Sequence, residues 1–87
     1  MPDSQSLPNT PDTVTVNARR LLCPLPVIRV QQAVENLPAG TRVIAICTDP
    51  GALQDIPAWA RVHGHTVLET RQQDREYIIV LQTGSTT

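Results

Sequence analysis

The sequence predicts an α/β two-layer sandwich of the order β-α-β-α-β-β, in which a four-stranded mixed sheet has two helices packed against it. Three observations support this fold class. Short β-branched or apolar runs alternate with two stretches of helical periodicity, the connections between them are short, and the last two runs follow each other directly. Strand–helix–strand units cross over right-handed and give parallel neighbours, whereas directly joined strands form an antiparallel hairpin.

The first part of the chain predicts a tail, a strand and a helix. Residues 1–12 are rich in Ser, Pro, Asn and Asp, and we expect them to be a disordered tail. TVTVN, at 13–17, has the alternation and β-branching of a short strand. Apolar side chains then recur every three or four residues over 24–37, which predicts a helix that ends at LPAG. The recurring positions are Val27, Val30, Val34 and Leu37.

A buried strand and a second helix follow. RVIAICT, at 42–48, is apolar on both faces, which is typical of a central strand. ALQDIPAWARVHGH then predicts a helix with Gly64 as its stop. Asp49, which a proline follows, is a candidate N-cap. Because Pro57 within the helical stretch suggests an irregular or late start, Asp55 is the alternative cap.

The end of the chain predicts a hairpin. TVLET at 66–70 and EYIIVLQ at 76–82 are the two strands, and RQQDR at 71–75 is the turn between them. With a frayed end at 84–87, residues 13–83 form a single domain without internal repeats. Because VIAIC and YIIVL carry apolar residues on both faces, we also expect the sheet face away from the helices to be either partly covered or an exposed apolar surface.

The composition argues against several classes of function. The 87 residues carry a formal net charge of −1 and include no lysine, so all seven Lys and Arg positions are arginines. A general nucleic-acid binder would show a basic excess, and Schiff-base chemistry needs a lysine amine. The chain has no apolar run of the ~18–20 residues that span a bilayer, and its N-terminus does not resemble a signal peptide. We therefore expect a cytoplasmic protein with two reduced cysteines and no direct contact with membrane.

The segment RLLCPLPVIRV carries the strongest chemical signal, a cysteine where the first helix begins. Pro24 falls in the first turn, where a missing N–H costs nothing, and Pro26 stiffens the same segment. The sulfur of Cys23 then lies at the positive end of the helix dipole, where the N–H groups of Leu25 and Val27 are expected to face an anion. A helix N-terminus lowers a thiol pKa, so we expect a thiolate or a persulfide anion. The alternative is a buried structural cysteine.

Further residues are candidates for a docking patch, a second thiol and a metal site. Leu25 and Ile28 fall off the core stripe, with Arg29 on the same face, and together they predict a small docking patch for a partner protein. Cys47 is expected to be a buried strand cysteine, and the alternative is a resolving thiol for Cys23. The two cysteines and two histidines match no standard zinc spacing, so we expect no metal and no organic cofactor.

Two blocks of sequence carry a family resemblance. CPLP, at a strand–helix junction, resembles the Cys-Pro-x-Pro motif of the TusA/SirA-like sulfur-carrier family, and TDPGALQDIPAWARVHGH resembles its Asp-Pro…Asp-Ile-Pro…His segment. The resemblance covers about residues 13–84 and implies the same two-layer fold. It also implies that Cys23 accepts sulfane sulfur as a persulfide and passes it to a partner protein. The other motif residues, which would support the site, are Pro24, Pro26, Asp49 and Asp55.

The resemblance implies a sulfurtransferase-type protein that acts as one step of a sulfur relay, rather than a free-standing enzyme. Family donors include cysteine desulfurases and rhodanese-like proteins, and acceptors include small hexameric proteins with their own cysteine. Members serve tRNA thiolation, molybdenum-cofactor assembly or sulfur oxidation. Asn17, Arg20 and Leu21 stand where the tRNA-thiolation branch has Asp and Gly-Leu. Gln31 and Gln32 replace its Arg-Lys, so the chain looks more like the branch linked to sulfur oxidation.

Two other functions stay open from the residues alone. One is a non-catalytic binding or regulatory module, in which Cys23 only packs against its neighbours. The other is a redox protein that cycles a disulfide between Cys23 and Cys47, and this requires Cα atoms within ~7 Å of each other. The reactivity of the first cysteine near neutral pH separates the carrier from the packing role.

Overall fold

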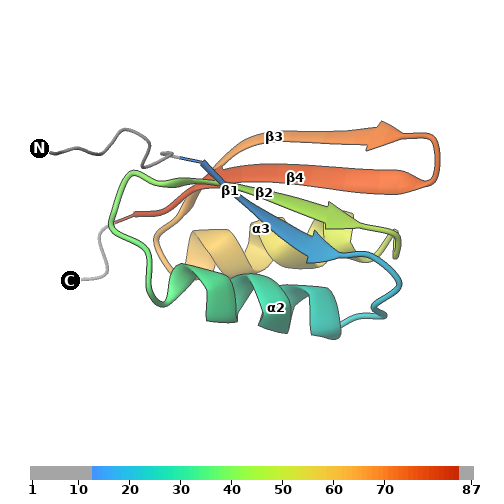
Figure 1. Cartoon of the computed structure of the whole chain (residues 1–87), viewed down its shortest axis with the longest axis horizontal. Coiled ribbons are helices and arrows are strands. Elements are labelled where there is room, and N and C mark those ends of the chain that lie inside the picture. The colour runs from blue at the N-terminus through green and yellow to red at the C-terminus, as the bar shows by residue number, and fades with distance from the viewer. Residues whose placement is uncertain (1–12, 85–87) are drawn as a thin grey trace, which may run out of the picture.

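The computed structural model describes residues 13–84 and confirms the predicted fold class. The predicted tail at 1–12 and residues 85–87 lie outside the described residues. The elements are β1 (Thr13–Ala18), α2 (Leu25–Val34), β2 (Arg42–Cys47), α3 (Ala52–Val62), β3 (Thr66–Gln73) and β4 (Glu76–Gln82). The sheet has the order β1-β2-β4-β3, with β1 and β2 parallel and the other pairs antiparallel. Both helices cover one face of this sheet (Figure 1).

Strand β2 is central, as its two apolar faces predict. Val43, Ala45 and Cys47 point toward the helices and are completely buried. Ile44 and Ile46 point to the opposite face, where they are partly buried beside the aliphatic residues of β4. That face therefore carries an aliphatic strip in the middle of the sheet, as the sequence suggested.

The core lies between the sheet and the two helices. Val30 of α2 is fully buried, and the other residues of the predicted stripe, Val27, Val34 and Leu37, pack around the core partly buried. Helix α3 buries three side chains completely; these are Ala52, Ile56 and Ala60. Burial of an aliphatic side chain of Val or Ile size is worth about 1.5–3 kcal/mol. The two apolar faces thus fix both helices on the sheet. Within residues 13–84, neither helix is long and apolar enough to cross a membrane.

The start of α3 differs from both predicted caps. Gly51 holds the N-cap position without a side-chain cap hydrogen bond, so neither Asp49 nor Asp55 caps the helix. Pro57 lies buried inside the helix and does not delay its start. The reason is that main-chain N–H groups ahead of the proline bond the carbonyls of Pro50 and Gly51, which closes the first turn.

The last hairpin is tighter than predicted. Strand β3 continues to Gln73, which pairs with Glu76, so the turn is only Asp74 and Arg75. Asp74 has a φ of 57°, the left-handed conformation that a two-residue hairpin needs and that Asp tolerates. The polar run at 71–73 lacks apolar alternation, so the sequence predicts a turn there, but an exposed edge strand needs only its backbone ladder to form.

The two ends of the sheet have different surroundings (Figure 1). At one end lie Thr13 and Gly84, the first and last described residues. There the hydroxyls of Thr41 and Thr83 both donate to the carbonyl of Pro38 at 2.7 Å and close the edge. At the other end β1 and β2 finish and both helices begin, so the two connections that follow parallel strands meet. Ligands of α/β sheets are bound at this kind of edge.

His65 holds Gly84, the last described residue, at the end of the sheet where β1 begins. Its Nδ1 accepts the N–H of Gly84 at 3.0 Å, and its ring lies 5.0 Å from that of Trp59 at the edge of the core. Burial, and to a smaller extent His63, lowers the pKa of this imidazole. A Cβ on Gly84 would overlap the carbonyl oxygen of Gly64, so only glycine allows this approach. Gly84 is the first residue of the segment 84–87 that we expect to be frayed, and these contacts hold it in place.

Candidate thiol site

Cys23 lies in the turn that leads from β1 into α2. Pro24 takes the N-cap position, so the helix begins at Leu25, one residue later than predicted, and Pro26 falls in its first turn. Both prolines stand where the helix needs no N–H donor. The N–H of Leu25 donates to the carbonyl of Leu22 at 2.8 Å. The expectation that this N–H faces an anion is therefore wrong.

Asp49 joins the cysteine turn to the start of α3. Its Oδ2 accepts the main-chain N–H of Cys23 at 2.8 Å, and its Oδ1 accepts the N–H of Gly51 at 3.2 Å. These bonds hold the pKa of the Asp49 carboxyl below its ordinary value, and the bond from Cys23 contributes most. The carboxylate is thus ionised at neutral pH. Through it the two motif blocks of the sequence, CPLP and DPG, are in contact.

Gly51 borders the sulfur directly. A Cβ on Gly51 would lie 3.3 Å from Sγ of Cys23 and 3.7 Å from each carboxylate oxygen of Asp49. The side of this glycine that lacks a side chain therefore faces the thiol and its acidic neighbour. Neither this contact nor the Asp49 bridge was predicted, because both join segments that are far apart in the sequence.

The surroundings of the sulfur overturn one electrostatic prediction. Burial first, and then the carboxylates of Asp49 and Asp55, together raise the pKa of the Cys23 thiol to about 12. A buried thiolate loses hydration, and nearby negative charges repel it. The predicted lowering of the pKa is wrong because these effects exceed that of the helix dipole, which is only about half an elementary charge. At neutral pH the resting thiol is protonated.

An exposed apolar surface adjoins the Cys23 turn. Leu22, Leu25 and Ile28 are 72%, 48% and 41% exposed, and we call these three residues the apolar patch. Leu25 and Ile28 were predicted; Leu22 was missed because it precedes the helix and a helical wheel does not place it. Arg29 is exposed as expected, and its Nη1 donates to the carbonyl of Asn17 at 3.4 Å. This arginine therefore lies between the patch and the end of β1.

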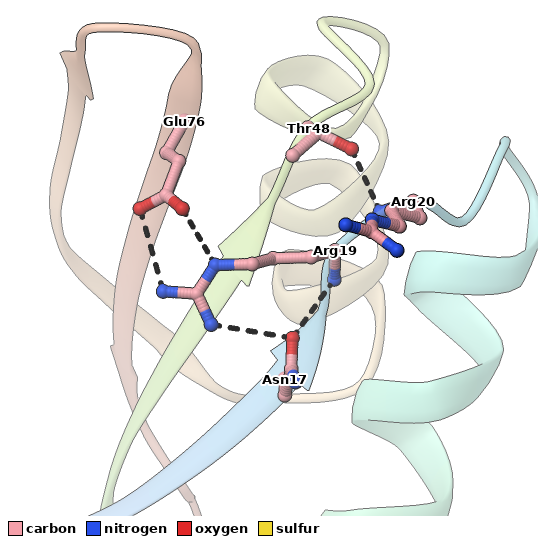
Figure 2. A network of polar contacts seen from close by, with 5 residues as sticks. All are labelled: Asn17, Arg19, Arg20, Thr48 and Glu76. Atoms are coloured by element: carbon pink, nitrogen blue, oxygen red, sulfur yellow. Dashed lines mark hydrogen bonds and ion pairs between the residues drawn. The ribbon is translucent and has the colours of Figure 1, made fainter.

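A polar network fixes the strand ends next to the cysteine turn (Figure 2). The guanidinium of Arg19 donates from Nε and Nη2 to the two carboxylate oxygens of Glu76, at 2.6 and 3.4 Å. Asn17 Oδ1 accepts the main-chain N–H of Arg19 at 3.1 Å. Arg20 has a φ of 67°, and its N–H donates to Oγ1 of Thr48 at 2.8 Å. The network holds the turn to β2 and β4, and sequence patterns could not predict it because its partners are distant.

Cys47, unlike Cys23, is not exposed to solvent. It is completely buried at the end of β2, as predicted, and both cysteines are free thiols. Burial, and to a smaller extent the charge of Asp49, raises the pKa of Cys47 to about 11. In the part of the chain that the structure describes, no three His, Cys, Asp or Glu side chains gather to hold a metal ion. The site is thus one half-buried thiol, Cys23, with acidic neighbours.

A mixed sheet with two helices on one face and a half-buried cysteine at a helix start defines a small α/β thiol protein. The family model "Sulfurtransferase TusA" matches residues 14–83. The chain is 41% identical over 63 residues to the sulfur carrier protein TusA of Pseudomonas putida strain GB-1, covering 72% of this chain and 78% of that protein. For TusA of strain W619 the identity is 36% over 69 residues, with coverage of 79% and 85%.

A solved structure agrees with this match. The SirA-like protein of Desulfitobacterium hafniense has a TM-score of 0.71 and 26% identity, and the comparison covers 82% of this chain and 97% of that one. Together with the family model, which spans nearly all of residues 13–84, this likeness confirms the resemblance seen in the sequence. The chain belongs to the TusA family.

Proposed function

We propose that this protein is a sulfur carrier that accepts sulfane sulfur as a persulfide on Cys23 and passes it to a partner protein. The supporting observation is the position of this thiol, half-buried at the start of α2 and adjoining the apolar patch, in a chain of the TusA family. Relatives in that family are named sulfur carrier proteins. Membership implies partner proteins, because a carrier needs a donor and an acceptor.

Loading is a transfer between two cysteines. The sulfur of Cys23 attacks the outer sulfur of a persulfide on the donor; a new S–S bond forms on Cys23 while the S–S bond of the donor breaks. The donor leaves as a thiolate, and it takes up the proton that Cys23 loses. Delivery repeats the step, with an acceptor thiolate attacking the outer sulfur and Cys23 leaving. The exchange is redox-neutral and needs no external oxidant or reductant.

The acidic surroundings make this exchange depend on a docked partner. With a pKa of about 12, Cys23 is almost entirely the poorly nucleophilic thiol at neutral pH. A partner that places a cation against Asp49 or Asp55 lowers this pKa, because an opposite charge offsets the repulsion of the thiolate. We propose that the free carrier is weakly reactive and that docking of the donor activates it. Reactivity near neutral pH therefore no longer separates a carrier from a packing cysteine, and persulfide loading of Cys23 does.

The apolar patch and Arg29 form the surface that we propose for docking. Their neighbours on α2, Gln31 and Gln32, are exposed and uncharged, which favours a partner other than that of the tRNA-thiolation branch. We propose a rhodanese-like protein or a cysteine desulfurase as the donor, in a cytoplasmic relay linked to sulfur oxidation. Relays for tRNA thiolation or molybdenum-cofactor assembly are the alternatives.

Intact-protein mass spectrometry tests the carrier role. After incubation with inorganic polysulfide at alkaline pH, the wild type gains about 32 Da, the mass of one sulfur atom, and a reductant removes it. Cys47→Ala gains the same mass and is the matched control, because it removes the other thiol of the chain. Cys23→Ala gains nothing. Equal loading of Cys23→Ala and the wild type would refute the proposal.

A further inference from the structure

The backbone conformation at residue 51 does not require a glycine. Gly51 has a φ of −60° and a ψ of −24°, which is ordinary right-handed helical conformation open to any residue. Gly51 holds the N-cap position of α3, where glycine is favoured over alanine, but its φ and ψ do not exclude a side chain. Gly40 and Gly64, in contrast, have φ values of 88° and 82°, where side chains are disfavoured. Backbone strain therefore does not require a glycine at position 51, and its surroundings give a second reason beside the N-cap preference.

Those surroundings belong to the thiol site. The three atoms nearest to a Cβ on Gly51 are Sγ of Cys23, at 3.3 Å, and the two carboxylate oxygens of Asp49, both at 3.7 Å. The distance to sulfur is shorter than an ordinary contact between carbon and sulfur, and the sulfur would have to move. The backbone offers no such freedom, because Asp49 holds the N–H groups of both Cys23 and Gly51.

We propose that Gly51 is a positioning residue, which gives the Cys23 sulfur the space to lie against the Asp49 carboxylate and thereby keeps the resting thiol unreactive. The inference rests on the proposed function of Cys23. In Gly51→Ala the added methyl group occupies this space, and the sulfur must give way by a few tenths of an ångström, which we expect to be toward solvent.

A sulfur displaced toward solvent gains reactivity for two reasons. It is better hydrated, and it moves away from the two charged groups that act on it, Asp49 of the turn after β2 and Asp55 of α3. Both groups are acidic, and the Cys47 thiol nearby in the core is uncharged, so no cation is lost in the movement. Hydration and distance from the carboxylates both favour the thiolate.

Alkylation kinetics test this role of Gly51. The rate of reaction of Cys23 with iodoacetamide is measured from neutral to alkaline pH, in a Cys47→Ala background, with and without Gly51→Ala. We expect the Gly51→Ala protein to react at least about threefold faster near neutral pH, with its rate profile displaced to lower pH. Gln54→Ala is the control: it introduces an alanine in the first turn of α3, at an exposed position, and should leave the rate unchanged.

Thermal unfolding is measured in parallel, and Gly51→Ser is a second variant with the same expected rate increase. A folded Gly51→Ala protein whose alkylation rate and pH profile equal those of the wild type, or whose rate is lower, would overturn the inference. The mass gain of the wild type is a separate measurement. If the wild type gains no mass, the carrier role is refuted. Unchanged alkylation of both Gly51 variants refutes only the positioning role.

Discussion

The main-chain N–H of Cys23 donates to the carboxylate of Asp49 at 2.8 Å, although the two residues are 26 positions apart. One side chain thus holds the turn before α2 and, through Gly51, the turn before α3. The same carboxylate raises the pKa of the thiol. Asp49 therefore has a structural and an electrostatic role, and substitutions can separate them.

Asp49→Ala removes the acceptor of two main-chain N–H groups, and we expect the Tm to fall by about 4 °C or more. Asp49→Asn keeps a carbonyl oxygen as acceptor but loses the charge, so its Tm should fall less while alkylation of Cys23 becomes faster. Thermal unfolding followed by circular dichroism and alkylation kinetics measure the two effects. A wild-type Tm in Asp49→Ala would contradict the structural role.

Asp55→Asn isolates the electrostatic role. The Asp55 side chain is exposed, and its negative charge contributes to the raised pKa of Cys23. We expect a Tm within about 2 °C of the wild type and faster alkylation of Cys23, by about tenfold for each unit by which the pKa falls. Glu69→Gln, which removes a charge from the exposed strand β3, is the control and should leave the rate unchanged. Equal rates in Asp55→Asn and the wild type would exclude this contribution.

The apolar patch should affect transfer between proteins but not loading by a small molecule. Leu25→Ser removes a 48%-exposed leucine of the patch, and we expect transfer from a persulfidated donor protein to slow by about tenfold. The mass gain with polysulfide should stay the same. Leu68→Ser is the matched control, because Leu68 is 45% exposed on β3, away from the patch. Equal slowing in the two variants would show that the patch is not the docking surface.

His65 should make the stability of the fold depend on pH. Because its folded-state pKa is lowered, the unfolded chain takes up a proton below about pH 6.5 that the folded chain resists. The free energy of unfolding therefore falls as the pH drops from about 6.5 toward the folded-state pKa, by at most about 1.4 kcal/mol per pH unit. Urea unfolding at a series of pH values measures this slope.

The slope should diminish in His65→Gln, which cannot be protonated, and persist in His63→Gln, whose side chain is exposed. Protonation of Nδ1 would also break the hydrogen bond from Gly84, so folding and protonation oppose each other at this position. A slope that is unchanged in His65→Gln would assign the pH dependence to other groups.

The sequence predicts the architecture well because periodicity reports burial. The two apolar faces of RVIAIC identified β2 as central, and the stripe through Val30 identified the face of α2 that packs on the sheet. Periodicity failed where burial does not decide the conformation. The exposed end of β3 forms because β4 offers its backbone as a partner, which no local pattern in the residues before Asp74 reports.

The candidate site was predicted in position but not in chemistry. Local signals placed Cys23 at a helix start and left Leu25 and Ile28 outside the core. The sign of the pKa shift was wrong because it depends on Asp49 and Asp55, which the chain brings to the sulfur only through the packing of α3 beside α2. Proline and aspartate in DPG suggested a helix cap, whereas the fold uses that carboxylate to bridge two turns.

Strand β1 begins at Thr13 and β4 leads to Gly84 at one end of the sheet, and the turn that holds Cys23 follows the other end of β1. The two ends of the described domain therefore lie on the side away from the sulfur, as the course of β1 and β4 in Figure 1 shows. The protein can be immobilised on a support, or fused to a donor enzyme, without its delivery end being blocked. Because the linker of such a fusion starts on the far side, it must be long enough to reach around the domain, and the effective concentration of the thiol then lies below about the millimolar range of short linkers. A weak docking interaction would then suffice for rapid turnover.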